Sequence, residues 1–276
     1  DYSKVIYVKK GVYKEKLILP SWLTNITICG EDRDNTIITW DDHANIKMPT
    51  GGLDSEAAVK GKPMGTFRTY TLKVQGSYIT LKNITIENNA AKLGQAVSLH
   101  LEGDHILVQN CRLLGNQDTV YTGIANNRSA FYDCYIEGTT DFIFGPGRAW
   151  FENCEIRSKA NSYITAASSP AGQEYGYVFN KCKLTAEPGI DKVYLGRPWR
   201  PYAATLFMNC EMGRHIRPEG WHNWGKHSNE QTARYSEYNN HGSGAATKAR
   251  VAWSRQLTKK EAAKVTIKNV FGEEAW

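Results

Sequence analysis

The sequence lacks any run of about 18 apolar residues, so none of its segments is expected to span a membrane. It contains no Cys-x-x-Cys pair and no paired-histidine spacing, which argues against a zinc site. A Gly-x-Ser-x-Gly elbow is missing and the seven histidines show no partnered pattern, so a Ser-His-Asp hydrolase is disfavoured. No signal peptide is visible, so export cannot be read directly from the chain.

Charge is present in modest excess. Basic residues outnumber acidic ones by 34 to 28, and they are dispersed rather than clustered. A modest basic excess suits an acidic partner, and the dispersion argues against nucleic acid as that partner. A hydrophobic content of 41% with 24 glycines suits a β-rich protein with many turns.

One short pattern recurs along the chain: a polar residue, Cys, any residue, and then Leu, Ile or Met. An earlier copy has Ile in the cysteine place, and the six anchors are Ile84, Cys111, Cys134, Cys154, Cys182 and Cys210. Spacings of 27, 23, 20, 28 and 28 residues separate them. Self-similarity at this period is typical of a solenoid.

Each copy lies at the end of an apolar or alternating run, at 78–86, 106–113, 129–136, 150–156, 177–184 and 205–212. Such runs, broken by Gly and Asn, indicate strands, and helical periodicity is scarce before the last twenty residues. Since about three short strands fit in each unit, we predict an all-β fold, a right-handed parallel β-helix. A solenoid grows by adding coils, so residues 1–276 are expected to form a single domain.

The remaining segments predict loops and a tail. At residues 41–65 the pattern lapses into Gly, Pro, Lys and Asp, which indicates a long loop that walls a groove. Thr258-Lys259-Lys260-Glu261 is a capping box that opens a short, structural C-terminal helix. Four aromatic residues after the coils are expected either to wall the groove or to cap the last coils: Trp221, Trp224, Tyr235 and Tyr238.

The cysteines should form a ladder. Neighbouring strands lie roughly 4.8 Å apart, so residues of equal phase in successive coils stack directly. Cys111 should stack on Cys134 and Cys134 on Cys154, as small inward-facing hydrophobic side chains. One rung could be oxidised, because stacked Cα atoms about 5 Å apart lie within disulfide range, and we expect that rung to be Cys134 with Cys154.

Two aspartates share a phase in the same way. Asp118 lies seven residues after Cys111, and Asp141 lies seven after Cys134, so the two carboxyls should lie about one rung apart on one face. Like charges that close push their pKa values apart. We therefore expect one carboxylate and one carboxylic acid near neutral pH, whereas either aspartate alone would indicate a solvated turn.

Five motifs in order along nearly the whole chain resemble those of the pectin methylesterases (pectinesterases), carbohydrate esterases with a right-handed parallel β-helix fold. They are Gly11-Val12-Tyr13-Lys14-Glu15, Gln95-Ala96-Val97-Ser98-Leu99, Gly115-Asn116-Gln117-Asp118-Thr119-Val120-Tyr121, Asp141-Phe142-Ile143-Phe144-Gly145 and Leu195-Gly196-Arg197-Pro198-Trp199. Family members usually begin with another strand and a short helix, which are absent here. Position 116 is Asn where an aromatic residue is common.

The resemblance implies a mechanism for hydrolysis of galacturonate methyl esters. Asp141 would be the nucleophile, and Asp118 would donate a proton to departing methanol and then activate the hydrolytic water. Gln117 and Gln95 would stabilise the oxyanion. Arg197 would hold the Asp141 carboxylate in its ionised form.

The resemblance also implies a substrate and a place of action. Trp199, Tyr121 and Phe144 would supply flat surfaces for sugar rings. The partner would be pectin (methylated homogalacturonan) or its oligomers, handled by a secreted or periplasmic monomer without a metal or another cofactor. A Gln95 assignment rests on the resemblance alone, because its phase, eleven after Ile84, does not match that of the aspartates.

Two rival functions stay open at this point. A pectate-lyase-like β-helix would need a calcium site of clustered carboxylates, and the chain shows no obvious acidic cluster beyond the pair. A non-catalytic β-helix that binds acidic glycans is the other rival. The loss of Asp118, Asp141 or Gln117 would have supported it, and all three are present.

Overall fold

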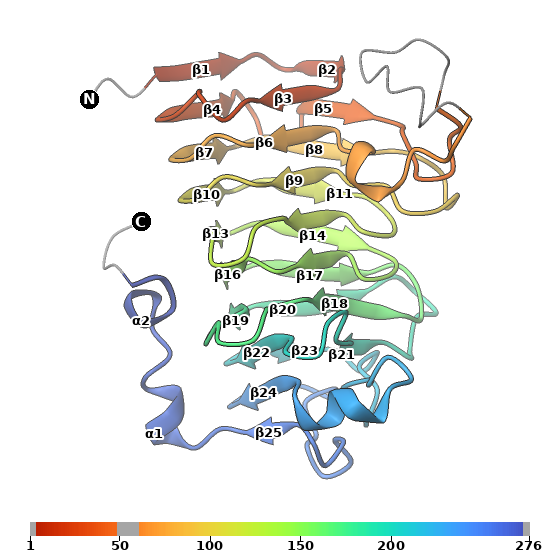
Figure 1. Cartoon of the computed structure of the whole chain (residues 1–276), viewed down its shortest axis with the longest axis vertical. Coiled ribbons are helices and arrows are strands. Elements are labelled where there is room, and N and C mark those ends of the chain that lie inside the picture. Colours follow the sequence, from red (N-terminus) through yellow and green to blue (C-terminus); the bar gives the residue numbers. More distant parts are fainter. Residues whose placement is uncertain (1–3, 49–60, 273–276) are drawn as a thin grey trace.

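The computed structural model describes residues 4–48 and 61–272 of the chain. Three parallel sheets run side by side along its length, and the chain visits them in turn, coil after coil (Figure 1). The predicted right-handed parallel β-helix is confirmed. None of the helices among these residues is long and apolar enough to cross a membrane.

The sheets are named A, B and C in the order in which the chain enters them. Sheet A contains β1 Lys4–Val8, β4 Ile26–Gly30, β7 Ile79–Lys82, β10 Ile106–Gln109, β13 Arg128–Tyr132, β16 Arg148–Glu152, β19 Tyr177–Asn180, β22 Ala204–Met208, β24 Arg234–Tyr238 and β25 Arg255–Gln256. Sheet B contains β2 Gly11–Lys14, β5 Thr36–Trp40, β8 Thr85–Asn88, β11 Arg112–Leu114, β14 Tyr135–Gly138, β17 Glu155–Ser158, β20 Lys183–Ala186 and β23 Glu211–Met212. Sheet C contains β3 Leu17–Leu19, β6 Leu72–Val74, β9 Leu99–Leu101, β12 Val120–Thr122, β15 Ile143–Gly145, β18 Tyr163–Ala167 and β21 Tyr194–Gly196.

Each run that the sequence predicts as one strand is in fact two strands, one in sheet A and one in sheet B. The chain turns the corner at the polar residue of the repeat, which has a left-handed backbone conformation: Asn83, Asn110, Asp133, Asn153, Lys181 and Asn209, with φ between 48° and 55°. Asn and Asp tolerate this conformation better than most residues. The Asn110 side chain also donates a 2.8 Å hydrogen bond to that of Asn83, which links successive corners.

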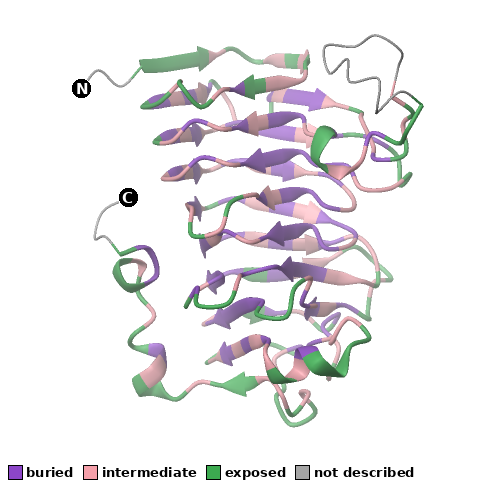
Figure 2. Ribbon diagram, viewed as in Figure 1, coloured by how far each residue is buried: buried purple, intermediate pink, exposed green. Residues whose placement is uncertain are grey.

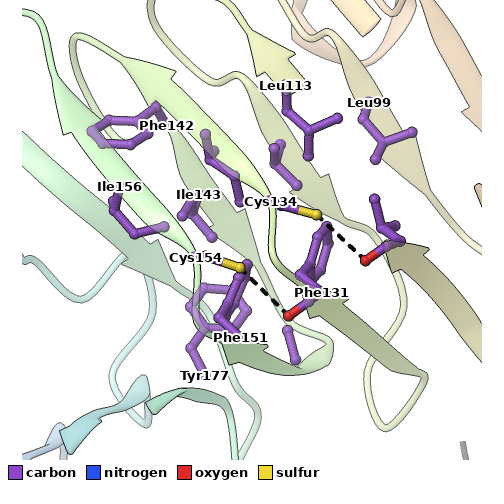
Figure 3. Close-up of a cluster of buried hydrophobic side chains, with 14 of the residues drawn as sticks. Leu99, Leu113, Phe131, Cys134, Phe142, Ile143, Phe151, Cys154, Ile156 and Tyr177 are labelled. Carbon is purple, nitrogen blue, oxygen red and sulfur yellow. Dashed lines mark hydrogen bonds between the residues drawn. The ribbon is translucent and has the colours of Figure 1, made fainter. Parts of the chain in front are cut away.

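The cysteine ladder points inward as predicted. Cys111, Cys134 and Cys154 are at most 2% exposed, and burial raises the pKa of each thiol well above its ordinary value. The predicted disulfide between Cys134 and Cys154 is wrong, because both are free thiols. Each thiol instead donates to a carbonyl of the preceding coil, Cys134 to Val108 at 3.4 Å and Cys154 to Phe131 at 3.5 Å (Figure 3).

A stack of phenylalanines fills the interior beside the cysteines. The rings of Phe131, Phe151, Phe179 and Phe207 lie 4.3–4.6 Å apart and within 11° of parallel, one ring per coil. All four are fully buried. Figure 2 shows the strands of the central coils largely in the colour of buried residues, and Figure 3 shows Phe131 and Phe151 among other buried hydrophobic side chains. The strand register of sheet A therefore places a phenylalanine at the same position in four successive coils.

Loops and helices complete the molecule. The predicted long loop is described at its two ends, 41–48 and 61–65, and leads into the 3₁₀ helix η2, Thr66–Arg68; residues 49–60 lie outside the described part. The predicted C-terminal helix is α1, Lys259–Ala262, with both hydrogen bonds of the capping box. A second helix, α2 at Ile267–Phe271, was not predicted, and arginines of β13 and β16 donate to its last carbonyls.

Candidate active site

A groove of about 320 Å³ lies on the outer face of sheet C. Its walls combine carboxyls, amides, one guanidinium and aromatic rings: Thr66, Phe67, Gln95, Gln117, Asp118, Asp141, Phe144, Ala166, Arg197, Trp199 and Trp224. Seven of the eight residues predicted for the site are among them. The eighth, Tyr121, packs on Phe144 with ring centroids 4.7 Å apart.

The coil register brings the two aspartates together. The backbone N–H of Asp118 donates to Thr140 at 3.1 Å, which places Asp118 one coil from Asp141. Each aspartate lies two residues before its strand of sheet C, and each has a left-handed backbone, with φ of 66° and 49°. The prediction of carboxyls one rung apart on the same face is therefore confirmed, and the left-handed turn suits Asp at both positions.

The two carboxyls differ in their partners. The guanidinium of Arg197 donates to both oxygens of Asp141, from Nε to Oδ1 at 2.9 Å and from Nη2 to Oδ2 at 2.6 Å. Among the described residues, none donates a hydrogen bond to the Asp118 carboxyl. A bidentate pair of this kind strongly favours the carboxylate form of Asp141.

Burial sharpens that difference. Asp118 is 7% exposed and Asp141 is 5% exposed. Burial, and next the charge of Asp141, raise the pKa of Asp118 well above its ordinary value. Burial also raises the pKa of Asp141, but the hydrogen bonds and charge of Arg197 oppose this rise. Asp141 is therefore the first of the pair to ionise, and Asp118 is the one that retains its proton.

The two glutamines lie one coil apart. The backbone N–H of Ala96, the residue after Gln95, donates to the Gln117 carbonyl at 3.0 Å. Within the described part of the chain, neither glutamine side chain hydrogen-bonds to another group, so both amides are available to the groove. Counting from Ile84 gave the wrong phase for Gln95, because the connection from β8 to β9 is longer than that from β11 to β12.

Aromatic side chains form part of the groove wall and pack behind it. His100, Tyr121, Phe144 and Ala166 occupy the same register position on four neighbouring strands, β9, β12, β15 and β18. Tyr121 also contacts the ring of Phe67 at 4.9 Å, and Phe144 contacts that of Trp199 at 5.9 Å. Phe144 and Ala166 therefore pack with Tyr121 and Trp199 in one cluster, which adjoins the carboxyls in the groove.

Three of the four aromatic residues after the coils divide between the two predicted roles, whereas Tyr238 packs against the cluster that contains Val270 and Phe271 of α2. Trp224 lines the groove, whereas Trp221 is 1% exposed and stacks on Tyr235 inside the last coils. Sequence reasoning missed Phe67, which follows the predicted long loop and belongs to no repeat. Among the described residues, no three His, Cys, Asp or Glu side chains group together in a way that could hold a metal ion.

Fold and site together define a class of protein, the parallel β-helix enzymes that carry paired carboxyls in a groove on one sheet. Within that class the chain belongs to the Pectinesterase family, whose profile matches residues 1–274. Pectinesterase 31 of Arabidopsis thaliana is 37% identical over 260 residues, which are 94% of this chain and 80% of that protein.

Solved structures agree with the family assignment. Pectin methylesterase from carrot superposes with a TM-score of 0.87 at 30% identity, covering 97% of this chain and 83% of that one. A pectin methylesterase in complex with hexasaccharide VII superposes with a TM-score of 0.81 at 30% identity, covering 98% of this chain and 89% of that one. The rival lyase and non-catalytic functions receive no support from these relatives.

Proposed function

We propose that this pectinesterase hydrolyses methyl esters of galacturonate residues in pectin through its paired aspartates, releasing methanol. The observation that carries the proposal is the asymmetry of two adjacent buried carboxyls, one held by Arg197 and one without a described donor. Pectin as the substrate is supported by the similar enzyme that binds a hexasaccharide.

Asp141 is the proposed nucleophile. Its ionised oxygen attacks the ester carbonyl carbon, and the carbonyl electron pair moves to oxygen to give a tetrahedral oxyanion. Arg197 keeps Asp141 ionised before attack and fixes its rotamer through two hydrogen bonds. Collapse of the oxyanion breaks the bond to the methoxy oxygen and leaves an acyl-enzyme on Asp141.

Asp118 is the proposed acid and base. Because its pKa is raised, the Asp118 carboxyl retains its proton before the reaction. It transfers this proton to the departing methoxy oxygen, so methanol leaves as a neutral molecule. Asp118 is then a carboxylate, and it removes a proton from the water that attacks the acyl-enzyme. Hydrolysis releases galacturonic acid, which loses its carboxyl proton to solvent, and both aspartates return to their starting protonation states.

Gln117 and Gln95 are the proposed oxyanion donors. Their amides line the groove on neighbouring coils and have no hydrogen bond to another described group, so their N–H groups can point at the developing charge. One such donor commonly contributes about 3 kcal/mol to transition-state stabilisation. Trp199, Tyr121 and Phe144 are proposed to pack against sugar rings and methyl groups beside the scissile ester.

The wider setting follows from the proposed substrate. We propose that the chain is one pectinesterase-like domain that acts as a monomer, and that it is secreted or periplasmic, because pectin is an extracellular polymer. A short oligomer could be handled in a periplasm, and a polymer outside the cell.

Methanol release from highly methylated pectin tests the proposal. With EDTA present, we expect the wild-type protein to release methanol and Asp141→Asn to release none; Asn suits the left-handed backbone at this position, so the variant should fold. Unsaturated uronate that appears only with calcium would instead establish a lyase. Pectin binding without any reaction would establish the glycan-binding alternative.

A further inference from the structure

The guanidinium of Arg197 is held between two aromatic rings. Its central carbon lies 4.0 Å from the ring centroid of Tyr163 and 3.7 Å from that of Trp224. Two rings this close to one planar group must cover opposite faces, because one face cannot accommodate both. The rings therefore restrict rotation of the plane from which Arg197 reaches both oxygens of Asp141.

Tyr163 is joined to the nucleophile in a second way. It is the first residue of β18, and its carbonyl accepts the backbone N–H of Asp141 at 2.8 Å. Its ring stacks on Tyr194 of the next coil at 5.3 Å and 12°. The Tyr163 ring thus contacts the Arg197 guanidinium and the parallel ring of Tyr194, and it does not line the groove.

His222 sets the position of the second ring. Its Nδ1 accepts a hydrogen bond from the backbone N–H of Trp224 at 3.0 Å. The backbone N–H of His222 donates to the carbonyl of Gly196, the residue before Arg197, at 3.1 Å. Trp224 has a φ of 62°, a conformation that a bulky residue rarely adopts without support. The His222 ring also packs on Tyr163 and Tyr194, at 5.4 and 5.2 Å.

We infer that Tyr163 and His222 are positioning residues, which hold Arg197 in the plane that keeps Asp141 ionised, Tyr163 directly and His222 through Trp224. The inference rests on the proposed function, since it assigns these residues a part in preparing the nucleophile. Neither residue lines the groove, so Tyr163 is expected to affect the reaction and not substrate binding, and His222 to affect the reaction first, with binding changed only through Trp224.

The charged and titratable groups around Arg197 agree with this inference. Asp118 and Asp141 face it from the turns before β12 and β15, Tyr163 from β18 and His222 from the loop after β23. Burial, then Arg197 and Arg217, lower the pKa of His222, which matches a neutral ring whose Nδ1 accepts a hydrogen bond. The central guanidinium carbon of Arg217 lies 4.7 Å from the ring centroid of Tyr194.

Paired variants test the inference. Tyr163→Leu removes the ring, whereas Tyr163→Phe keeps it. His222→Leu removes the acceptor for Trp224, whereas His222→Asn can restore it, since an Asn side chain accepts the N–H two residues ahead. Methanol release gives kcat and KM against pH, and carbon-13 NMR of the aspartate carboxyls gives the pKa of Asp141 without any need for activity.

Both Leu variants are expected to lower kcat about tenfold or more, because the nucleophile is misplaced. KM should stay within about twofold in Tyr163→Leu, whose ring does not line the groove, whereas it can also change in His222→Leu, because Trp224 lines the groove. The acid limb of kcat/KM should rise by about half a pH unit or more, since a loosened Arg197 favours ionised Asp141 less. The Phe and Asn variants should recover most of the loss.

Three results would overturn the inference: unchanged kcat in the Leu variants, an equal loss in Tyr163→Phe, or a change confined to KM. If the wild-type protein releases no methanol, the proposed function fails, and the Asp141 titration decides the inference alone. A rise of the Asp141 pKa in Tyr163→Leu but not in Tyr163→Phe would then sustain it, and equal values would end it.

Discussion

The interior of the coils and the groove on the outer face of sheet C share one strand register, but the register repeats side chains in the interior and varies them in the groove. Inside, one side chain repeats from coil to coil, as in the stacks of cysteine and phenylalanine. On the outer face, one register position carries a different residue on each of four neighbouring strands: His100, Tyr121, Phe144 and Ala166. Repetition gives the coils their packing, and departure from repetition gives the groove its chemistry.

The aspartates of the groove are buried nearly as completely as the cysteines of the interior, but the two kinds of group differ in whether they ionise. The thiols are buried among apolar groups, which favours their neutral form. Asp141 is buried almost as deeply, yet Arg197 supplies a partner that makes its charge tolerable. The groove can therefore hold one carboxylate and one carboxylic acid on two neighbouring rungs.

The largest effect is expected from Asp141→Asn, which removes the negative charge from the groove and leaves the interior unchanged. Turnover should fall by about four orders of magnitude, because the acyl-enzyme can no longer form. Methanol release under saturating pectin measures the loss. Activity within tenfold of the wild-type value would show that Asp141 is not the nucleophile.

An interior change should have the converse effect. Phe151→Ala removes the ring stacked between Phe131 and Phe179 and should lower the free energy of unfolding by about 3–5 kcal/mol. KM of the folded protein should stay near the wild-type value. Denaturant titration measures stability, and Phe151→Leu serves as the milder control. A stable variant with altered KM would contradict the separation of the two regions.

A smaller loss is expected when one groove amide is removed. Gln117→Ala should lower kcat about 100-fold with little change in KM, because an oxyanion donor acts in the transition state and not on bound substrate. Steady-state kinetics at several pectin concentrations separate the two constants. A rise in KM at constant kcat would instead make Gln117 a substrate-binding residue.

The smallest effect concerns stability and depends on pH. Because the folded pKa of Asp118 lies well above its unfolded value, the folded state binds more protons between these two values, and stability falls as pH rises through that window. Asp118→Asn should therefore raise the free energy of unfolding at neutral pH by about 0.5–2 kcal/mol while lowering activity. Thermal unfolding at pH values below and above the window should show the gain only above it. Equal stability at every pH would contradict the raised pKa.

Much of this architecture follows from local pattern. Equal spacing of Asp118 and Asp141 from their cysteines was enough to place them on one face, because strand spacing fixes the rungs. The corners at Asn83 and its equivalents escaped prediction, since an apolar run does not reveal a single residue in the left-handed conformation. The expected disulfide failed because Cα spacing alone does not say where a thiol points.

Other parts of the site depend on contacts that no repeat encodes. Gln95 follows a longer connection, so its phase could not be counted from Ile84. No motif singles out Tyr163, and only the fold shows that its ring covers Arg197. Phe67 reaches the groove from η2, which lies outside the repeated units.

The most direct test of the account is a carbon-13 NMR titration of the two carboxyls in the wild-type protein. We expect two separate transitions, with Asp141 ionising first and Asp118 keeping its proton to a pH well above the ordinary aspartate range. Assignment comes from Asp118→Asn and Asp141→Asn, each of which removes one signal. Two overlapping transitions near pH ~4, the ordinary value for aspartate, would contradict the division of labour between the aspartates.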